Sequence, residues 1–294
     1  MRARSLGCGL GMTLVLLLSG CFSVTDLGRF HTEEGTASSP ASASGQYLDL
    51  KFSMLGMKPH VGQVLQYRVI DAMNRVQSRG VVHGLPTSTD VTVFAPAAVP
   101  KINGPYRLDF FADVNLSGGY DGLGSVISDD HAWRIQPLAD YPADSVPPVD
   151  GMIQVTFVHS TSFTDIDDYP SGTKNPPVDT GLAAVIHLQS LPDAVGKLGE
   201  IRVAEKATGH VVALYRIPQL LAANLDAKID GAVDVGTDYD IDVYLDANND
   251  GKYDNPATSS ADLVWRVTAT SSATGLEATI DAALESAKID VGPP

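Results

Sequence analysis

The stretch YDIDVYLDANNDGKYD, residues 239–254, decides how the rest of the chain is interpreted. Its first half alternates apolar and polar residues, as a half-buried β-strand does. Its second half is an acidic loop that contains glycine. An earlier stretch, YRLDFFADVNLSGGYD at residues 106–121, has the same form, and seven of its sixteen positions are identical at a constant spacing. This repeat predicts two copies of one small β domain.

Short apolar runs separated by Gly, Pro, Asn and Asp extend the repeat in both directions. They predict an all-β fold of two tandem β-sandwich domains produced by internal duplication. The expected strands of the first copy cover residues 47–55, 64–70, 79–82, 90–94, 106–113, 131–135 and 152–159, and those of the second cover 182–188, 200–203, 226–235, 239–246 and 262–267. Residues 220–225 are compatible with a helical turn, residues 276–284 with a strand or a short helix, and residues 286–294 with a frayed end.

Each copy contains one tryptophan, and the two share a place in the repeat. Trp133 lies in HAWRI and Trp265 in LVWRV. A large aromatic residue at matched sites of two sandwich domains is expected to fill the core between the sheets, with a ligand platform as the alternative.

The N-terminus has the features of an export signal. Arg2 and Arg4 precede an apolar run at residues 6–18, which is too short and too rich in glycine to span a bilayer. The run ends in LSGC at residues 18–21, which resembles the lipobox of bacterial lipoprotein precursors. That resemblance implies cleavage before Cys21 and lipidation of Cys21, which would anchor the chain in the cell envelope. Phe22 in place of Asp after the cysteine implies the outer membrane; an ordinary signal peptide is the alternative.

Composition divides the chain into five segments and limits its partners. We expect a signal peptide at residues 1–20, a flexible tether at 21–46, a first β-sandwich domain at 47–167, a linker at 168–180 and a second β-sandwich domain at 181–288. The chain has 35 acidic and 20 basic residues and a formal net charge of −15, which excludes nucleic acids as partners. Its two cysteines, Cys8 and Cys21, leave no disulfide and no cysteine-ligated zinc in the mature chain.

The acidic loop of the second copy has the spacing of a calcium site. Calcium binds six to eight oxygens, which alternate residues of a tight loop can supply, and glycine permits the sharp bend. The loop resembles the first nine positions of an EF-hand or dockerin calcium loop, and D-x-N-x-D-G hairpins occur in bacterial transthyretin-like and immunoglobulin-like modules. The predicted ligands are Asp246, Asn248, Asp250, the backbone carbonyl of Lys252, Asp254 and Asp262 in the second copy, and Asp113, Asn115, Ser117, Asp121 and Asp130 in the first.

Two departures separate these loops from an EF-hand. The twelfth position of the second loop is Ala257, so the bidentate acid is missing, and a strand rather than a helix precedes the loop. Asp262 is the residue expected to complete the site. The alternative is a plain hairpin loop in which Asp and Asn stabilise turns without a cation.

No catalytic constellation occurs in the sequence. There is no G-x-S-x-G, P-loop, dinucleotide fingerprint or zinc-helix motif, and the histidines lie singly. The preferred hypothesis is therefore a non-enzymatic, lipid-anchored envelope protein whose two modules bind a protein or polysaccharide partner, with calcium-stiffened loops. A carbohydrate-active or other hydrolase that uses the acidic loops, and a structural spacer without a ligand, are the alternatives.

Overall fold

The computed structural model describes residues 45–102, 104–123, 130–139, 151–170, 172–251, 253–259, 261–284, 286–287 and 289–291. Within these ranges the chain forms strands, turns and two short 3₁₀ turns, and contains no α-helix. The predicted all-β fold is confirmed. Across the described ranges, no helical segment combines the length and apolar character that a membrane crossing requires. Lys252, Cys21, the expected signal peptide and the expected tether up to residue 44 lie outside the described residues.

The fourteen strands of the described residues divide into two sets of seven in chain order. We call the first set module 1 and the second module 2. Module 1 consists of β1 (Tyr47–Leu55), η3 (Lys58–His60), β2 (Val64–Ile70), β3 (Val76–Val82), β4 (Val91–Pro100), β5 (Tyr106–Asp113), β6 (His131–Ala139) and β7 (Met152–Val158). Module 2 consists of β8 (Leu182–Gln189), η5 (Pro192–Ala194), β9 (Gly199–Glu205), β10 (Val211–Ile217), β11 (Leu225–Val233), β12 (Asp238–Leu245), β13 (Leu263–Thr270) and β14 (Leu276–Asp281).

The two modules have the same strand order. In module 1 a three-stranded sheet, β4-β1-β7, accompanies the row β3-β2-β5-β6, and in module 2 the sheet β11-β8-β14 accompanies the row β10-β9-β12-β13. The central strand of each small sheet pairs antiparallel with one neighbour and parallel with the other. The predicted duplication therefore extends beyond one hairpin to every strand of the fold.

The two four-stranded rows join into a single eight-stranded sheet. Strand β3 of module 1 lies parallel to β10 of module 2, with Arg79 opposite Ala213 and Val81 opposite Tyr215. Backbone hydrogen bonds thus continue from one module to the other. We call the line along β3 and β10 the seam.

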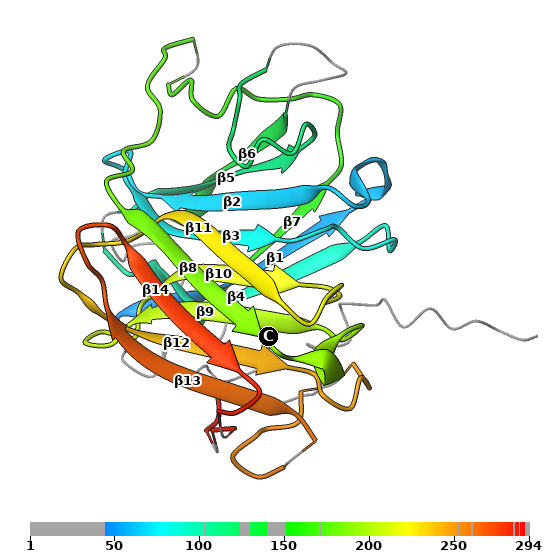
Figure 1. The fold of residues 1–294 in the computed structure, drawn as a ribbon. Helices are drawn as coiled ribbons and strands as arrows, with labels where there is room; N and C mark the ends of the chain where they lie inside the picture. Colours follow the sequence, from blue (N-terminus) through cyan, green and yellow to red (C-terminus); the bar gives the residue numbers. More distant parts are fainter. Residues whose placement is uncertain are drawn as a thin grey trace, which may run out of the picture.

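The small sheets cover opposite faces of the central sheet. Successive residues of a strand point to opposite faces. At the seam, Leu214 packs in the core of module 1 and the adjacent Tyr215 in the core of module 2, while Val81 of module 1 packs in the core of module 2. Figure 1 shows β8, β11 and β14 in front of the central sheet and β1, β4 and β7 behind it. Each module therefore contributes side chains to the hydrophobic core of the other.

The strand pattern of the repeated stretch places its residues as predicted. In β5, Leu108, Phe110 and Ala112 lie in the core of module 1, whereas Phe111 packs in a small cluster on the other face. Trp133 and Trp265 are 3% and 5% exposed, and they belong to the cores of modules 1 and 2. The prediction that each tryptophan fills a core is confirmed.

Three sequence expectations differ from the structure, and one open alternative is decided by it. Strand β10, at residues 211–217, had no counterpart among the predicted strands, although it forms half of the seam. Residues 220–224 are not helical. Of the two alternatives for residues 276–284, the strand is confirmed, since residues 276–281 form β14. The described residues of the tail pack instead of fraying: Ala287 N donates to Val264 O at 2.6 Å, and Val291 is buried.

The segment after β7 returns along the outer face of module 1. Arg134 donates to the backbone oxygens of Ile166 and Asp168 at 2.7 and 2.9 Å, and Val76 N donates to Val178 O at 3.1 Å. Most of the expected linker at 168–180 is thus attached to module 1 by hydrogen bonds. The domain boundaries drawn from the sequence stay a prediction.

Candidate functional site

The acidic loops follow equivalent strands of the central sheet. Loop 1 (residues 113–121) follows β5, and loop 2 (residues 246–254) follows β12. Equivalent ion pairs hold the two strands. Arg134 donates to both oxygens of Asp109 at 2.7 and 2.8 Å, and Arg266 donates to both oxygens of Asp242 at 2.6 Å. The two loops therefore start from equivalent positions and directions.

Loop 2 is closed by its own carboxylates and amides. Gly251 N donates to Asp246 Oδ2 at 3.1 Å, and Asp250 N donates to Asn248 Oδ1 at 3.1 Å. The amide of Asn248 donates to Asp254 Oδ2 at 2.9 Å. The glycine has a φ of +76°, a left-handed conformation that suits glycine.

Asp262 connects loop 2 to the start of β13. Its two oxygens accept the backbone N–H groups of Ala247 at 3.2 Å and Asp254 at 2.7 Å, and Tyr244 OH donates to it at 2.7 Å. The sequence placed Asp262 on the face opposite Trp265 and beside the loop, and the structure brings it there. Burial raises the pKa of Asp262 to about 6.

Loop 1 repeats this arrangement. Asn115 donates to Asp121 Oδ2 at 2.7 Å, and Asp130 accepts from Val114 N at 3.2 Å and from Asp121 N at 2.9 Å. Ser117 N donates to Asn115 Oδ1 at 3.0 Å. Four predicted residues of each loop thus occupy equivalent positions in one hydrogen-bond pattern. At a fifth position Asp250 of loop 2 is replaced by Ser117 in loop 1, and the sixth predicted ligand of loop 2, Lys252, lies outside the described residues.

The loops differ at the first carboxylate. In loop 1 both oxygens of Asp113 accept backbone N–H groups, from Ser117 at 3.0 Å and Gly118 at 2.8 Å. In loop 2 Asp246 Oδ1 is buried and has no hydrogen bond of ordinary geometry, and Asp246 as a whole is 2% exposed. Burial raises the pKa of Asp246, and the nearby backbone N–H groups of Gly251, Asn249 and Asp250 partly offset that effect. A buried carboxylate oxygen without a partner is costly unless a proton or a cation occupies it.

The described residues contain no ready-made cluster of three His, Cys, Asp or Glu side chains for a metal ion. A cation in either loop would therefore depend on amide and backbone oxygens as well as carboxylates. The assignment of calcium ligands stays a prediction, and the backbone carbonyl of Lys252 lies outside the described residues.

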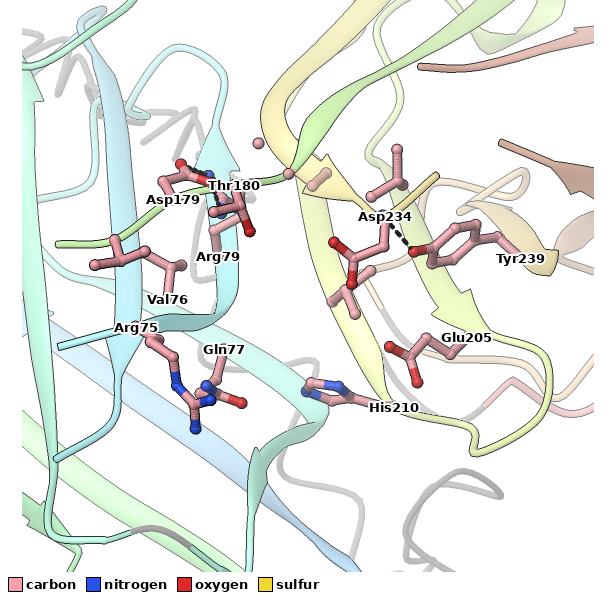
Figure 2. Close-up of a pocket in the computed structure, with 16 residues that line it drawn as sticks. Arg75, Val76, Gln77, Arg79, Asp179, Thr180, Glu205, His210, Asp234 and Tyr239 are labelled. Carbon is pink, nitrogen blue, oxygen red and sulfur yellow. Dashed lines mark hydrogen bonds and ion pairs between the residues drawn. The ribbon is translucent and has the colours of Figure 1, made fainter. Parts of the chain in front are cut away.

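Two cavities open along the seam, and both have walls from both modules. The first, of about 320 Å³, is bounded by Arg75, Gln77 and Arg79 of module 1 and by Glu205 and Asp234 of module 2 (Figure 2). Arg79 is held at its edge by Asp179, at 2.6 and 2.9 Å, and by the backbone oxygen of Asp230 at 2.7 Å. Basic and amide groups thus face carboxylates across this cavity.

The second cavity, of about 510 Å³, lies between the outer face of module 1 and β11. Gln66 and Arg68 of β2 and residues 116–120 of loop 1 form one wall, and Lys228 and Asp230 form the other. Two nitrogens of Arg68, Nε and Nη2, are buried without a hydrogen-bond partner. These cavities depend on the contact between modules, which no feature of either copy alone predicts.

Three histidines that lie singly in the sequence converge at the loop end of module 1. His60, His131 and His159 surround Trp133, with centroid distances to its ring of 5.5, 6.5 and 5.7 Å. The available signal was positional: each histidine lies at the end of a predicted strand or in a turn beside one. A sheet brings such ends together.

Comparisons with known proteins give distant structural similarity only. No protein family profile and no curated protein sequence matches the chain. The tip fimbrial protein Mfa3 from Porphyromonas gingivalis matches with a TM-score of 0.25 and 7% identity, over 75% of this chain and 81% of that one. A protein from Parabacteroides distasonis described as a cell adhesion protein gives 0.23 and 12%, over 85% and 92%, and the major pilin T-13 of Streptococcus pyogenes gives 0.16 and 8%, over 67% and 80%. These scores are too low to transfer a fold or a function, so the function is argued below from this chain's own residues.

Proposed function

We propose that the protein is a lipid-anchored, non-enzymatic binding protein of the bacterial cell envelope. Cys21 would hold the chain to a membrane, in keeping with the LSGC sequence, and the outer membrane is the proposed location. The joined modules would bind a protein or polysaccharide partner along the seam. The observation that carries this proposal is the pair of cavities whose walls come from both modules.

The joining of the modules supports a binding role. Ligand sites often lie where two domains meet, because neither domain alone closes such a site. Here continuous backbone pairing between β3 and β10 fixes the two walls relative to each other. A fixed site loses less conformational entropy on binding than a hinged one.

The charge of the seam supports a polar partner. In a chain with a formal net charge of −15, the lining of the larger cavity is balanced in charge. It contains the basic residues Arg68, Arg79 and Lys228 and the acidic residues Asp113, Asp179 and Asp230. Lys228 is paired with Asp230 at 2.8 Å but its side chain is 59% exposed, so it is accessible to a partner. Sugar hydroxyls and carboxylates, or the polar groups of a peptide, are the chemistry that such a surface binds.

The anchor is tested by labelling cells with a radioactive fatty acid. The wild-type chain is expected to take up label and to fractionate with membranes, whereas Cys21→Ser should do neither. An unlabelled wild-type chain would refute the lipid anchor and leave the binding proposal intact.

The seam is tested with the unlipidated Cys21→Ser protein and purified envelope polysaccharide or envelope protein. Lys228→Glu is expected to weaken binding at least tenfold, because it reverses a charge in the larger cavity. Lys206→Glu, an exposed lysine on the turn before β10 and outside both cavities, is the matched control and should bind as the parent does. Equal binding by both variants would exclude the larger cavity of the seam as the site.

Loop 2 is proposed to take calcium as a stabilising ion. The support is the buried Asp246 Oδ1, which has no hydrogen bond of ordinary geometry and is set among the alternating oxygen side chains of Asn248, Asp250 and Asp254. In loop 1 both oxygens of Asp113 already accept backbone N–H groups, which makes that loop the internal control.

The calcium proposal is tested by melting curves in EDTA and in excess calcium. Calcium is expected to raise the Tm of the wild type and of Asp113→Asn by several degrees, through preferential binding to the folded state. It should not raise the Tm of Asp246→Asn. An identical calcium response in Asp246→Asn, or none in the wild type, would leave loop 2 as a plain turn.

A further inference from the structure

The three-histidine cluster of module 1 contains a direct contact between two imidazoles. His60 comes from η3 and is 1% exposed, and His159 follows β7. Their Nε2 atoms lie 3.1 Å apart, and their ring centroids 5.1 Å. His131 stacks on Phe163 at 4.1 Å, and its two ring nitrogens are buried without a partner.

The hydrogen bonds of His60 determine which of its two ring nitrogens carries a proton. Its Nδ1 lies 2.8 Å from Gln63 Oε1, an oxygen that only accepts, so Nδ1 carries the proton. In neutral His60 the Nε2 atom carries no proton, so it accepts a hydrogen bond from the Nε2–H group of His159. A second proton on His60 would put two N–H donors and a positive charge against each other at 3.1 Å, and the contact would be lost.

The surroundings of this pair disfavour its charged form. Burial lowers the pKa of His60 and of His159, and the charges that act on them are those of other histidines: His131 and His159 on His60, and His131 on His159. Lys58, on the same turn as His60, is exposed. Asp130 directly precedes β6, and its oxygens accept from the backbone N–H groups of Val114 and Asp121. Asp90 Oδ1 accepts from Gly56 N.

Module 2 shows that the fold does not require histidine at these places. His60 is the third residue of η3, and the third residue of the equivalent η5 is the buried Ala194. His131 is paired with Ala112, and the equivalent pair in module 2 is Leu263 with Leu245. Module 1 therefore carries ionisable rings where its duplicate carries aliphatic side chains.

Hydrogen bonds also join the segments that meet at the cluster to their neighbours: Gly62 N donates to Leu85 O at 2.8 Å, and Thr164 N to Ala132 O at 2.8 Å. Met57 N donates to Thr89 O at 2.6 Å, His159 N to Leu55 O at 2.8 Å, and Trp133 Nε1 to Ser160 O at 2.9 Å. Loop 1 lies at this end of module 1, because it follows the last residue of β5 and precedes β6. Separation of His60 from His159 would remove a direct side-chain contact between the η3 turn and the segment after β7, next to the loop.

We propose that the contact between His60 and His159 is pH-sensitive and that mild acid opens the loop end of module 1 while module 2 stays closed. The groups have lowered pKa values, so the folded protein holds fewer protons than the open form. Acid therefore favours the open form, and raising the pH through the same range closes it again.

The test uses Trp133, which contacts the cluster, as the reporter. In Trp265→Phe, where Trp133 is the single tryptophan, emission should change reversibly between pH 8 and pH 5, with far-UV circular dichroism unchanged. In Trp133→Phe, the emission of Trp265 should stay constant over the same range. A constant Trp133 signal, or the same change at Trp265, would overturn the proposal.

Variants assign the transition to the pair. His159→Gln in the Trp265→Phe background should abolish the pH-dependent change in emission, and His187→Gln, which alters a histidine paired with Asp226 in module 2, should leave it intact. A second measurement leaves all three histidines of the cluster in place. In an NMR titration of Trp265→Phe, the chemical shifts of the ring protons of His60 and His159 should change over the same pH range as the Trp133 emission. A transition that persists in His159→Gln, or ring protons that titrate independently of Trp133, would refute the assignment.

Discussion

The duplicated ion pair of the central sheet allows one perturbation to be made twice in different surroundings. Asp109 is fully buried, and its partner Arg134 has a side chain that is 7% exposed. Arg107 also donates to Asp109, at 3.1 Å. The equivalent Asp242 is 9% exposed, and its partner Arg266 is 40% exposed. Asp109→Ala would leave two buried guanidinium groups without their carboxylate, whereas Asp242→Ala would leave one that reaches water.

The expected costs follow from this difference in burial. Removal of one partner of a buried pair costs about 3–5 kcal/mol, and removal of an exposed one costs about 1 kcal/mol or less. With a urea m-value of about 3 kcal/mol/M for a chain of this size, the unfolding midpoint should fall by about 1 M or more for Asp109→Ala. For Asp242→Ala the fall should be about 0.3 M. Equal losses in the two variants, measured by far-UV circular dichroism, would refute the assignment of burial as the cause.

Two further predictions concern packing and pH. In Gly80→Ala the new Cβ would lie 2.2 Å from the buried ring of Tyr67, so a loss of about 1–3 kcal/mol is expected in the same urea assay. Gly199→Ala, whose Cβ would have no neighbour nearer than 3.5 Å, should change stability by less than about 0.5 kcal/mol, and a larger loss there would contradict the packing argument. Burial lowers the pKa of His210 to about 4, so the unfolded chain binds the extra proton between about pH 6.5 and 4 and stability should fall as the pH falls through that range. His210→Phe should remove on the order of 3 kcal/mol of that loss at pH 4, and an unchanged pH profile would show that His210 does not titrate there.

The fold class could be predicted because it depends on local patterns of apolar and polar residues. Alternation in residues 106–113 and 239–246 fixes which side chains face the core, and the repeated Asp109 and Asp242 fix equivalent positions of the two copies. The sequence does not predict strand β10, because VVALYRI is apolar on both faces apart from Arg216 and shows no alternation. Its burial on both faces is a consequence of the seam, where one face packs in each core.

The candidate site was predictable only in part, because some of its residues are close in sequence and others are brought together only by the fold. The residues of loops 1 and 2 are close in sequence, so their spacing shows that they meet. The seam cavities and the histidine cluster join residues such as Arg79 with Asp230 and His60 with His159, which are far apart in the chain. Only the pairing of strands brings them together, and no local pattern specifies that pairing.

The central claim is that β3 and β10 join the two modules into one sheet, and the two tryptophans test it directly. In urea at neutral pH, Trp133 emission in Trp265→Phe and Trp265 emission in Trp133→Phe are each compared with far-UV circular dichroism of the same variant. Because the sheet is continuous, both emission curves should coincide with the circular dichroism curve in a single transition. Two separate transitions, with each tryptophan following a different one, would show that the modules fold independently and would contradict the account.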